Sequence, residues 1–211
     1  NANIAATASI VDAAKKSDVK SIIFISVVGA SPGSRNAYFR SKGVAEELVL
    51  GSGLGARILR TPILFGPNAA GSQAIIGMIS SGQAKLLGGG HYQMRPLDID
   101  DLSEALTILC SASIQDQVTY ELVGPESAPY RDIIEMTAQV MGKTIAFGNV
   151  PILLAKFGAA ITSILKGGGI TPTVIDVITQ DEIVKTNADS ALGITLTPMK
   201  RTLEKMTSLG D

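Results

Sequence analysis

The sequence of 211 residues predicts an α/β fold built on a parallel sheet. Residues 19–26 (VKSIIFIS) form an apolar run rich in isoleucine, which is typical of a strand buried on both faces. Residues 56–61 (ARILRT) predict a second short strand. A helical pattern precedes the first strand and another separates the two. This alternating order implies parallel strands joined by right-handed crossovers.

The chain opens with a helical pattern, because apolar residues recur at helical spacing over residues 4–14. After the first strand, the glycine, serine and proline residues at 29–34 predict a loop. A helix that contains Tyr38 and Lys42 follows, and Asn36 is its candidate N-cap. This helix ends at a group of glycines before the second strand.

The ends of the two predicted strands are of functional interest. Ser26 closes the first strand and Pro62 follows the second. Loops at the carboxyl ends of parallel strands are where α/β sheets bind ligands. Further along, Asp98, Asp100 and Asp101 favour the start of a helix, where capping is preferred over catalysis. The downstream pattern predicts helices at 72–81, 103–110 and 129–141, strands at 85–87, 92–97 and 118–123, and a mostly helical remainder at 150–211.

The composition narrows the class of protein. The chain is 45% apolar with a formal charge of −1, which does not favour a nucleic-acid partner. Cys110 and His91 are its only cysteine and histidine, so a disulfide framework is excluded and a His/Cys metal site is not expected. The apolar run at 151–165 is about fifteen residues long, whereas spanning a bilayer takes about 20. A buried or interface helix and a membrane-surface helix both remain open for this run.

Tyr38 and Lys42 are the candidate pair for chemistry. Four residues apart in a predicted helix, the phenol and the ammonium lie on one face, one turn from each other. A tyrosine has a pKa of about 10, and a nearby cation favours its phenolate. The pair is therefore suited to acid/base work on a hydroxyl or a carbonyl. The spacing alone is weak evidence, and other motifs must support it.

Such motifs occur along the chain in an order that resembles the order found in the extended and atypical short-chain dehydrogenase/reductase superfamily. The resemblance is to its NAD-dependent epimerase/dehydratase-like members. Within it, the sequence is most similar to the group that contains the dehydrogenase-like accessory subunit of respiratory complex I. The resemblance covers nearly the whole chain. It is carried by residues 3–14 before the strand, IIFIS at 22–26, Tyr-x-x-x-Lys at Tyr38 and Lys42, RTPILFGP at 60–67, RPLDIDDL at 95–102 and GPESAPYRDIIEMTAQVMGK at 124–143.

The resemblance implies a fold, a cofactor and a set of site residues. The fold is α/β, the C-terminal part of a Rossmann-like parallel sheet with flanking helices plus a small, mostly helical C-terminal lobe. The cofactor is NAD or NADP, and no metal is expected. The implied catalytic residues are Tyr38, Lys42 and Ser26; the implied cofactor-binding residues are Lys42, Thr61, Pro62, Ile63 and Phe65; and the implied substrate-binding residues are Arg95 and His91.

Two features depart from the family pattern. The glycine-rich phosphate loop, G-x-x-G-x-x-G after a first strand, occurs nowhere in the sequence. We therefore expect that the chain corresponds to a member from just before its fifth strand onward, without roughly the first hundred residues. The family's catalytic Ser or Thr falls near Val27 or Val28, and Ser26 is the nearest hydroxyl.

These departures leave two functions open. One is an NAD(P)-dependent oxidoreductase or nucleotide-sugar-epimerase-like protein that uses the Tyr–Lys pair, and the alternative is a non-catalytic NAD(P)H-binding structural or regulatory subunit of a respiratory-chain complex. Expected partners are a small-molecule substrate or a quinone-like ligand, and a protein complex or a homodimer, with no nucleic acid and no transmembrane segment. The expected location is the bacterial cytoplasm, or in a eukaryote the matrix side of the mitochondrial inner membrane. The expected domains are a partial NAD(P)-binding domain at 1–124, with a cleft-forming segment at 84–102, and a substrate or partner lobe at 125–211.

Overall fold

The computed structural model describes residues 2–111, 117–166 and 171–208, without the side chains of 161–166. The chain divides into two compact units, each assembled from separate stretches of sequence, and each is described by itself. Unit 1 comprises Asn1–Pro62, Asp100–Val123 and Val184–Thr195, and unit 2 comprises Ile63–Ile99, Gly124–Ile183 and Leu196–Asp211. Gly124 begins one of the three stretches of unit 2, and residues 63–99 of the expected first domain also belong to unit 2. Whether 1–124 and 125–211 work as separate domains stays a prediction.

Unit 1 contains a three-stranded parallel sheet in the order β1-β2-β7. β1 (Ser21–Val27) pairs with β2 (Gly55–Thr61) along its whole length, and β2 pairs with β7 (Val118–Glu121). The parallel sheet with flanking helices confirms the predicted fold class. The helices of unit 1 are α1 (Ala2–Lys16), α2 (Ala37–Leu50), α4 (Ile99–Ser111) and the short α8 (Asp189–Leu192).

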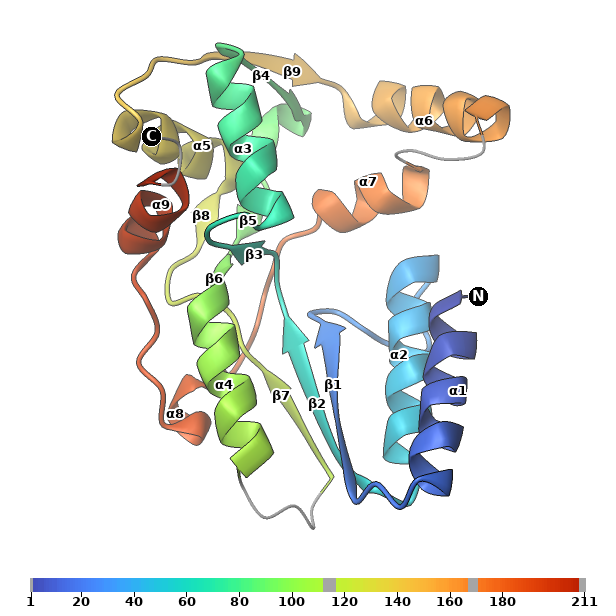
Figure 1. Cartoon of the computed structure of the whole chain (residues 1–211). Helices are drawn as coiled ribbons and strands as arrows, with labels where there is room; N and C mark the ends of the chain where they lie inside the picture. Colours follow the sequence, from blue (N-terminus) through green and yellow to red (C-terminus); the bar gives the residue numbers. More distant parts are fainter. Residues whose placement is uncertain (1, 112–116, 167–170, 209–211) are drawn as a thin grey trace. The chain divides into compact units, whose positions relative to one another are not determined.

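Alternate residues of β2 face different helices. Ile58 packs into a buried cluster with Val11 of α1 and Val49 of α2. Arg57, on the opposite face, donates a hydrogen bond of 2.6 Å to the backbone oxygen of Leu109 in α4. Figure 1 shows the same arrangement, with α1 and α2 on one side of the sheet and α4 on the other. Successive side chains of a strand point to opposite faces, so β2 contacts the helices on both faces of the sheet.

Unit 2 surrounds a separate core. Phe65, Ile75, Ile133 and Leu203 belong to its cluster of buried side chains. Two parallel pairs, β3–β6 and β4–β9, and one antiparallel pair, β5–β8, connect its segments. Its elements are β3 (Leu64–Phe65), α3 (Ala70–Ser80), β4 (Gln83–Leu87), the 3-10 turn η1 (Gly88–Gly90), β5 (Gln93–Met94), β6 (Leu97–Asp98), β8 (Ala128–Pro129), α5 (Tyr130–Val140), β9 (Ala146–Val150), α6 (Ile152–Lys166), α7 (Pro172–Ile178) and α9 (Met199–Thr207).

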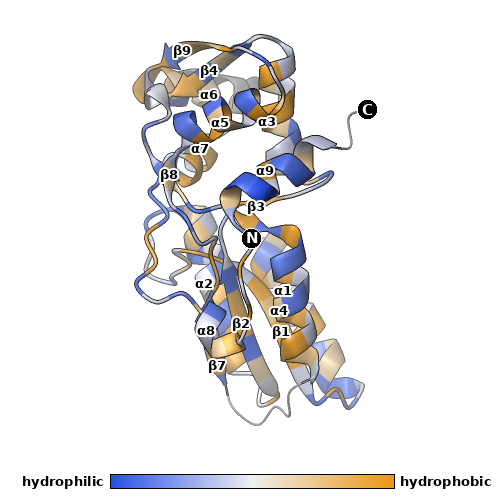
Figure 2. Cartoon of the chain, turned by 90° about the vertical axis from the view of Figure 1, so that its left-hand side faces the viewer, coloured by the Kyte–Doolittle hydropathy of each residue, from blue (hydrophilic) through white to orange (hydrophobic). Residues whose placement is uncertain are grey.

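The helix α9 illustrates how unit 2 buries apolar surface. Leu203 and Met206 lie in its core, whereas Lys200 and Glu204 are exposed. The exposed side of α9 is the hydrophilic surface that faces the viewer in Figure 2. Apolar residues three or four positions apart form one stripe of a helix, so α9 can cover the core without burying its charges.

Several predicted elements differ in detail from the structure. The strand predicted at 92–97 is two short strands, β5 and β6, because Pro96 lacks the N–H that a continuous ladder needs. The strand β9 was not predicted. Asp98 ends β6 directly before α4, is buried, and accepts hydrogen bonds from Thr202 and Lys205.

The apolar run at 151–165 corresponds to α6. Leu153, Leu154 and Phe157 are exposed on this helix, whereas Ala159 is buried, so both faces carry apolar residues. The side chain of Ile161, another residue of the run, lies outside the described residues. Among the residues that the structure describes, no helix combines the length and the apolar character needed to cross a bilayer.

Candidate functional site

The helix α2 contains Tyr38 and Lys42, and Lys42 reaches the carboxyl-terminal part of β1. The side chain of Asn36 accepts hydrogen bonds from the backbone N–H groups of Tyr38 (2.9 Å) and Phe39 (3.4 Å), which confirms it as the N-cap. Lys42 Nζ donates to the backbone oxygen of Ile25 at 3.2 Å. This contact places the ammonium near the strand end at which parallel sheets bind ligands.

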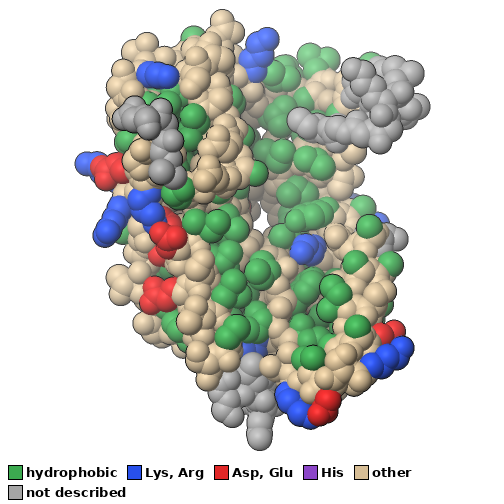
Figure 3. Space-filling model, in the orientation of Figure 1, with side chains coloured by type: hydrophobic (Ala, Val, Ile, Leu, Met, Phe, Trp, Pro, Cys, Tyr) green, Lys and Arg blue, Asp and Glu red, His purple; other side chains and the backbone are tan. Residues whose placement is uncertain are grey.

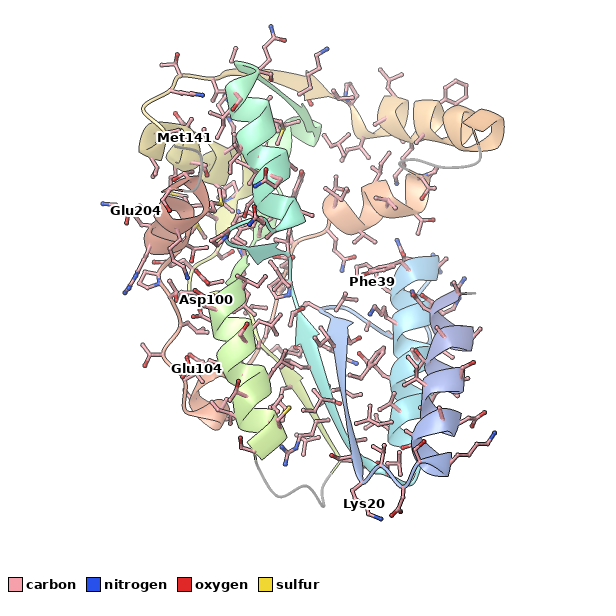
Figure 4. All side chains as sticks on the ribbon, in the orientation of Figure 1. Lys20, Phe39, Asp100, Glu104, Met141 and Glu204 are labelled. Carbon is pink, nitrogen blue, oxygen red and sulfur yellow. The ribbon has the colours of Figure 1, made fainter. Side chains whose placement is uncertain are left out.

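The aromatic surroundings of the pair explain its burial. The ring of Tyr38 lies 5.8 Å, centroid to centroid, from that of Phe39, which is buried and is labelled on α2 in Figure 4. Lys42 Nζ lies 5.0 Å from the centroid of the Phe24 ring, within the range of a cation–π contact. These rings remove part of the water around both polar groups.

This burial sets the direction of both pKa shifts. Burial raises the pKa of Tyr38, which is opposite to the lowering that a neighbouring ammonium would cause. Burial lowers the pKa of Lys42, and the carboxylate of Glu46 partly opposes that shift. In this structure the phenol is therefore a protonated group, able to donate a proton, and Lys42 is directed to β1 instead of activating Tyr38.

Ser26 lies at the end of the same strand but is almost inaccessible. Its side chain is 1% exposed, and its Oγ has no hydrogen-bond partner among the described residues. A buried hydroxyl without a partner costs about 1–3 kcal/mol. The backbone oxygen of Ser26 accepts a long hydrogen bond of 3.4 Å from Thr61 Oγ1. An unsatisfied hydroxyl at a strand end is consistent with a functional role, and that role stays a prediction.

The loop before α2 is packed against the helix at Gly43, directly after Lys42. A Cβ atom at Gly43 would lie 2.3 Å from the carbonyl carbon of Ser31 and 2.4 Å from the nitrogen of Pro32. The backbone N–H of Ser31 also donates to the oxygen of Phe39 at 3.2 Å. Sequence reasoning did not single out this contact. A glycine in the interior of a predicted helix was the available signal, because such a position usually disfavours glycine.

One turn further along α2, Glu46 is already engaged. It accepts hydrogen bonds from Arg60 of β2, at 2.9 Å from Nε and 2.6 Å from Nη2. Arg60 also contacts Glu121 of β7 at 3.2 Å. The side chain of Glu46 is 5% exposed, so this two-pronged pair is largely shielded from water. It ties α2 to the sheet and thereby fixes the position of Lys42.

The implied cofactor-binding residues at 61–65 are divided between the two units. In unit 1, Thr61 is buried and its backbone oxygen accepts a hydrogen bond of 3.1 Å from Val28, and Pro62 follows it with partial exposure. In unit 2, Ile63 donates its N–H to Glu182 at 3.3 Å, and Phe65 is fully buried in the core. The side chain of Phe65 thus packs in the core, so a cofactor at this residue would contact its backbone.

Gly66, next to Phe65, has a structural reason to be glycine. Its φ of +149° lies where residues with a side chain are strained, and a Cβ atom would lie 2.5 Å from Ile99 Cγ2. The backbone conformation and the packing against Ile99 therefore explain why this turn needs a glycine.

The implied substrate-binding residues both lie in unit 2, and one of them is held by the backbone. The guanidinium of Arg95 donates to the oxygen of Gly124 at 3.1 and 2.8 Å, and its backbone N–H donates to Glu182 at 2.7 Å. His91 is exposed. Arg95 thus links β5 to the segment after β7, and a substrate contact for either residue stays a prediction.

Glu182 is a half-buried carboxylate that sequence reasoning missed. Its two oxygens accept from two N–H groups, those of Ile63 and Arg95. Burial raises its pKa, and these two hydrogen bonds oppose the shift. The described residues contain no group of three or more His, Cys, Asp or Glu arranged to hold a metal ion.

Comparison with known proteins identifies the fold. The chain matched no protein-family model and no curated protein. Among solved structures it is similar to MoeE5 in complex with UDP-glucuronic acid and NAD, with a TM-score of 0.73 and 18% identity, over 97% of this chain and 69% of MoeE5.

Two further structures give the same result. The enzyme WbmH of Bordetella bronchiseptica in complex with NAD+ has a TM-score of 0.69 and 15% identity, over 98% of this chain and 67% of WbmH. The triphenylmethane reductase of Citrobacter sp. with NADP(H) has a TM-score of 0.71 and 20% identity, over 95% of this chain and 70% of the reductase. At these identities the likeness shows the fold alone: the chain has the Rossmann-like α/β fold that these proteins share.

Proposed function

We propose that this chain belongs to an NAD(P)-dependent oxidoreductase or nucleotide-sugar-epimerase-like protein, in which Tyr38 and Lys42 serve the nicotinamide end of the cofactor. The observation that carries the proposal is the position of Lys42 Nζ, 3.2 Å from the backbone oxygen of Ile25 at the carboxyl end of a parallel strand. Ligands of open α/β sheets bind at this edge. The similar structures that contain NAD or NADP(H) support the choice of cofactor.

The residues present fit the ribose of such a cofactor. An ammonium has three N–H donors, and the described residues accept one hydrogen bond from Lys42. The remaining donors suit the two hydroxyls of a ribose. The hydroxyl of Ser26, which has no hydrogen-bond partner among the described residues, is a second polar group at the same strand end. The cofactor would supply the hydride chemistry, and this chain's residues would hold its ribose and move a proton.

Tyr38 is the proposed proton donor and acceptor. Its raised pKa keeps the phenol protonated, which suits donation of a proton to a substrate carbonyl oxygen. In the reverse direction, the phenolate would accept the proton of a substrate hydroxyl. That direction requires Lys42 to turn from Ile25 toward the phenol, because a nearby cation favours the phenolate. Thr61, Pro62, Ile63 and the backbone at Phe65 are proposed to border the cofactor.

One observation favours a second candidate, a non-catalytic NAD(P)H-binding subunit of a larger assembly such as a respiratory-chain complex. Ser26 is 1% exposed, so its hydroxyl cannot polarise a substrate oxygen without a movement of its surroundings. In this candidate Lys42 still holds the ribose, and the buried hydroxyl has no catalytic task.

Two substitutions in the intact protein separate these candidates. Lys42→Ala should weaken NAD(P)H binding in both, measured by calorimetric titration. Tyr38→Phe should leave that binding nearly unchanged and abolish turnover of NAD(P)H only in the enzyme. Unchanged cofactor affinity in Lys42→Ala would remove the proposed role of Lys42 and, with it, the functional proposal.

A further inference from the structure

Unit 2 contains a cavity of about 600 Å³ between the strand β4 and the helices α6 and α7. Figure 3 shows hydrophobic side chains gathered over α7 beside a hollow in the surface. Cavities of about 300–1,000 Å³ are the usual size for small-molecule sites. The aliphatic lining includes Leu86, Leu87, Ala155, Ala159, Ile175 and Ile178.

The charge of this lining argues against a nucleotide. Among the described residues that line the cavity, Lys85 is the one with a charged side chain, and it is exposed. A diphosphate group is normally held by several donors, such as paired cations or the backbone N–H groups of a helix N-terminus. A single exposed lysine beside aliphatic side chains does not provide them. The lining suits an uncharged molecule.

Two tyrosines provide uncharged polar groups to the cavity. The rings of Tyr92 and Tyr130 stack with centroids 5.5 Å apart and an angle of 21° between their planes, and both line the cavity. Burial raises the pKa of both phenols, so both remain protonated donors at neutral pH. Neither hydroxyl forms a hydrogen bond with any residue that the structure describes. A buried or half-buried phenol usually finds a partner, and a ligand can supply it.

We propose that this cavity binds an uncharged, largely apolar small molecule with an oxygen that accepts a hydrogen bond from Tyr92 or Tyr130. All of the lining residues belong to unit 2, and none of them belongs to the Tyr38–Lys42 pair. The inference therefore goes beyond the proposed cofactor chemistry and holds whether or not the protein is an enzyme.

Gly158 on α6 gives a direct test of the site. It lines the cavity, and a Cβ atom there would meet nothing within 4 Å, so the larger side chain of Gly158→Leu should reduce the volume of the cavity. Gly77 on α3 is a matched control, because it is also a helical glycine with nothing within 4 Å and it does not line the cavity.

The probe is Nile red, an uncharged apolar dye with a carbonyl oxygen, titrated by fluorescence into the intact protein. In Gly158→Leu the Kd should rise about tenfold or more, whereas Gly77→Leu should stay within about twofold of the unsubstituted protein. Thermal melts check that both variants fold. Equal affinities in both variants, or no binding to the unsubstituted protein, would overturn the site.

The chemical class is tested with the tyrosines. Losing one hydrogen bond of about 0.5–1.5 kcal/mol should raise the Kd for Nile red about two- to tenfold in Tyr92→Phe or Tyr130→Phe. Pyrene, a hydrocarbon without oxygen, should bind these variants and the unsubstituted protein equally. Uridine diphosphate should not displace Nile red. Displacement of Nile red by uridine diphosphate would overturn the assignment of the ligand class. An equal loss of affinity for pyrene and for Nile red in the tyrosine variants would also overturn it.

Discussion

Gly43→Ala should destabilise the protein even though it improves a helix. Gly43 lies within α2, where alanine is preferred over glycine by about 0.5–1 kcal/mol. Its added methyl group, however, would lie 2.3 Å from the carbonyl carbon of Ser31 and 2.4 Å from the nitrogen of Pro32. Both are backbone atoms, so no change of rotamer relieves the overlap. The loop must move away from the helix.

The cost of that movement can be estimated from known cases of overpacking, which lose about 1–3 kcal/mol. Movement of the loop would also weaken the hydrogen bond from the Ser31 N–H to the Phe39 oxygen, which contributes about 0.5–1.5 kcal/mol. Together these losses exceed the gain in helix propensity. We expect a net loss of about 1–3 kcal/mol, which lowers the Tm by about 2–4 °C for each kcal/mol in a chain of this length.

The assay is urea or thermal unfolding followed by circular dichroism, with Gly77→Ala as the control. Gly77 is an exposed helical glycine with open space at its Cβ position, so its replacement should stabilise the protein by about 0.5–1 kcal/mol. The two variants should therefore shift stability in opposite directions. If Gly43→Ala is as stable as Gly77→Ala, the loop does not pack on α2 as described, and the placement of Tyr38 beside it loses its support.

The remaining predictions concern single side chains. Glu182→Gln should cost about 1–3 kcal/mol in unfolding experiments, because one amide oxygen cannot replace two carboxylate oxygens that accept from Ile63 and Arg95. The pKa of Glu182 is raised in the folded protein, so its contribution to stability is present below the ordinary Glu pKa and is lost as the pH rises through the raised value. A stability profile with the same pH dependence in Glu182→Gln would contradict this. Asn36→Ala should lower the free energy of unfolding by about 1 kcal/mol, because it removes the cap of α2. Asn36→Asp keeps an acceptor and should retain most of the stabilisation from the cap. Equal losses of stability in the two variants would argue against capping.

Local features of the fold could be predicted from neighbouring residues. The Asn36 cap and the one-turn spacing of Tyr38 and Lys42 depend on helix geometry within a few residues, and the structure contains both the cap and the helix. The strand at 19–26 could be recognised because its apolar run is continuous, and β1 occupies Ser21–Val27. The strand β9 could not, since AFGNV has little strand character, and its pairing with β4 supplies what its sequence lacks.

The candidate site shows the same division. The sequence by itself determined which side chains lie at the ends of β1 and β2, because a strand segment and the turn residues that follow it are local patterns. Only the tertiary structure decided that the Ser26 hydroxyl is buried with no hydrogen-bond partner among the described residues. The same holds for the ion pair of Arg60 with Glu46 and for the two distant backbone N–H groups that donate to Glu182. Burial and pairing depend on residues far apart in the chain, which no local pattern encodes. For the same reason the direction of the Tyr38 pKa followed from its burial and not from its spacing to Lys42.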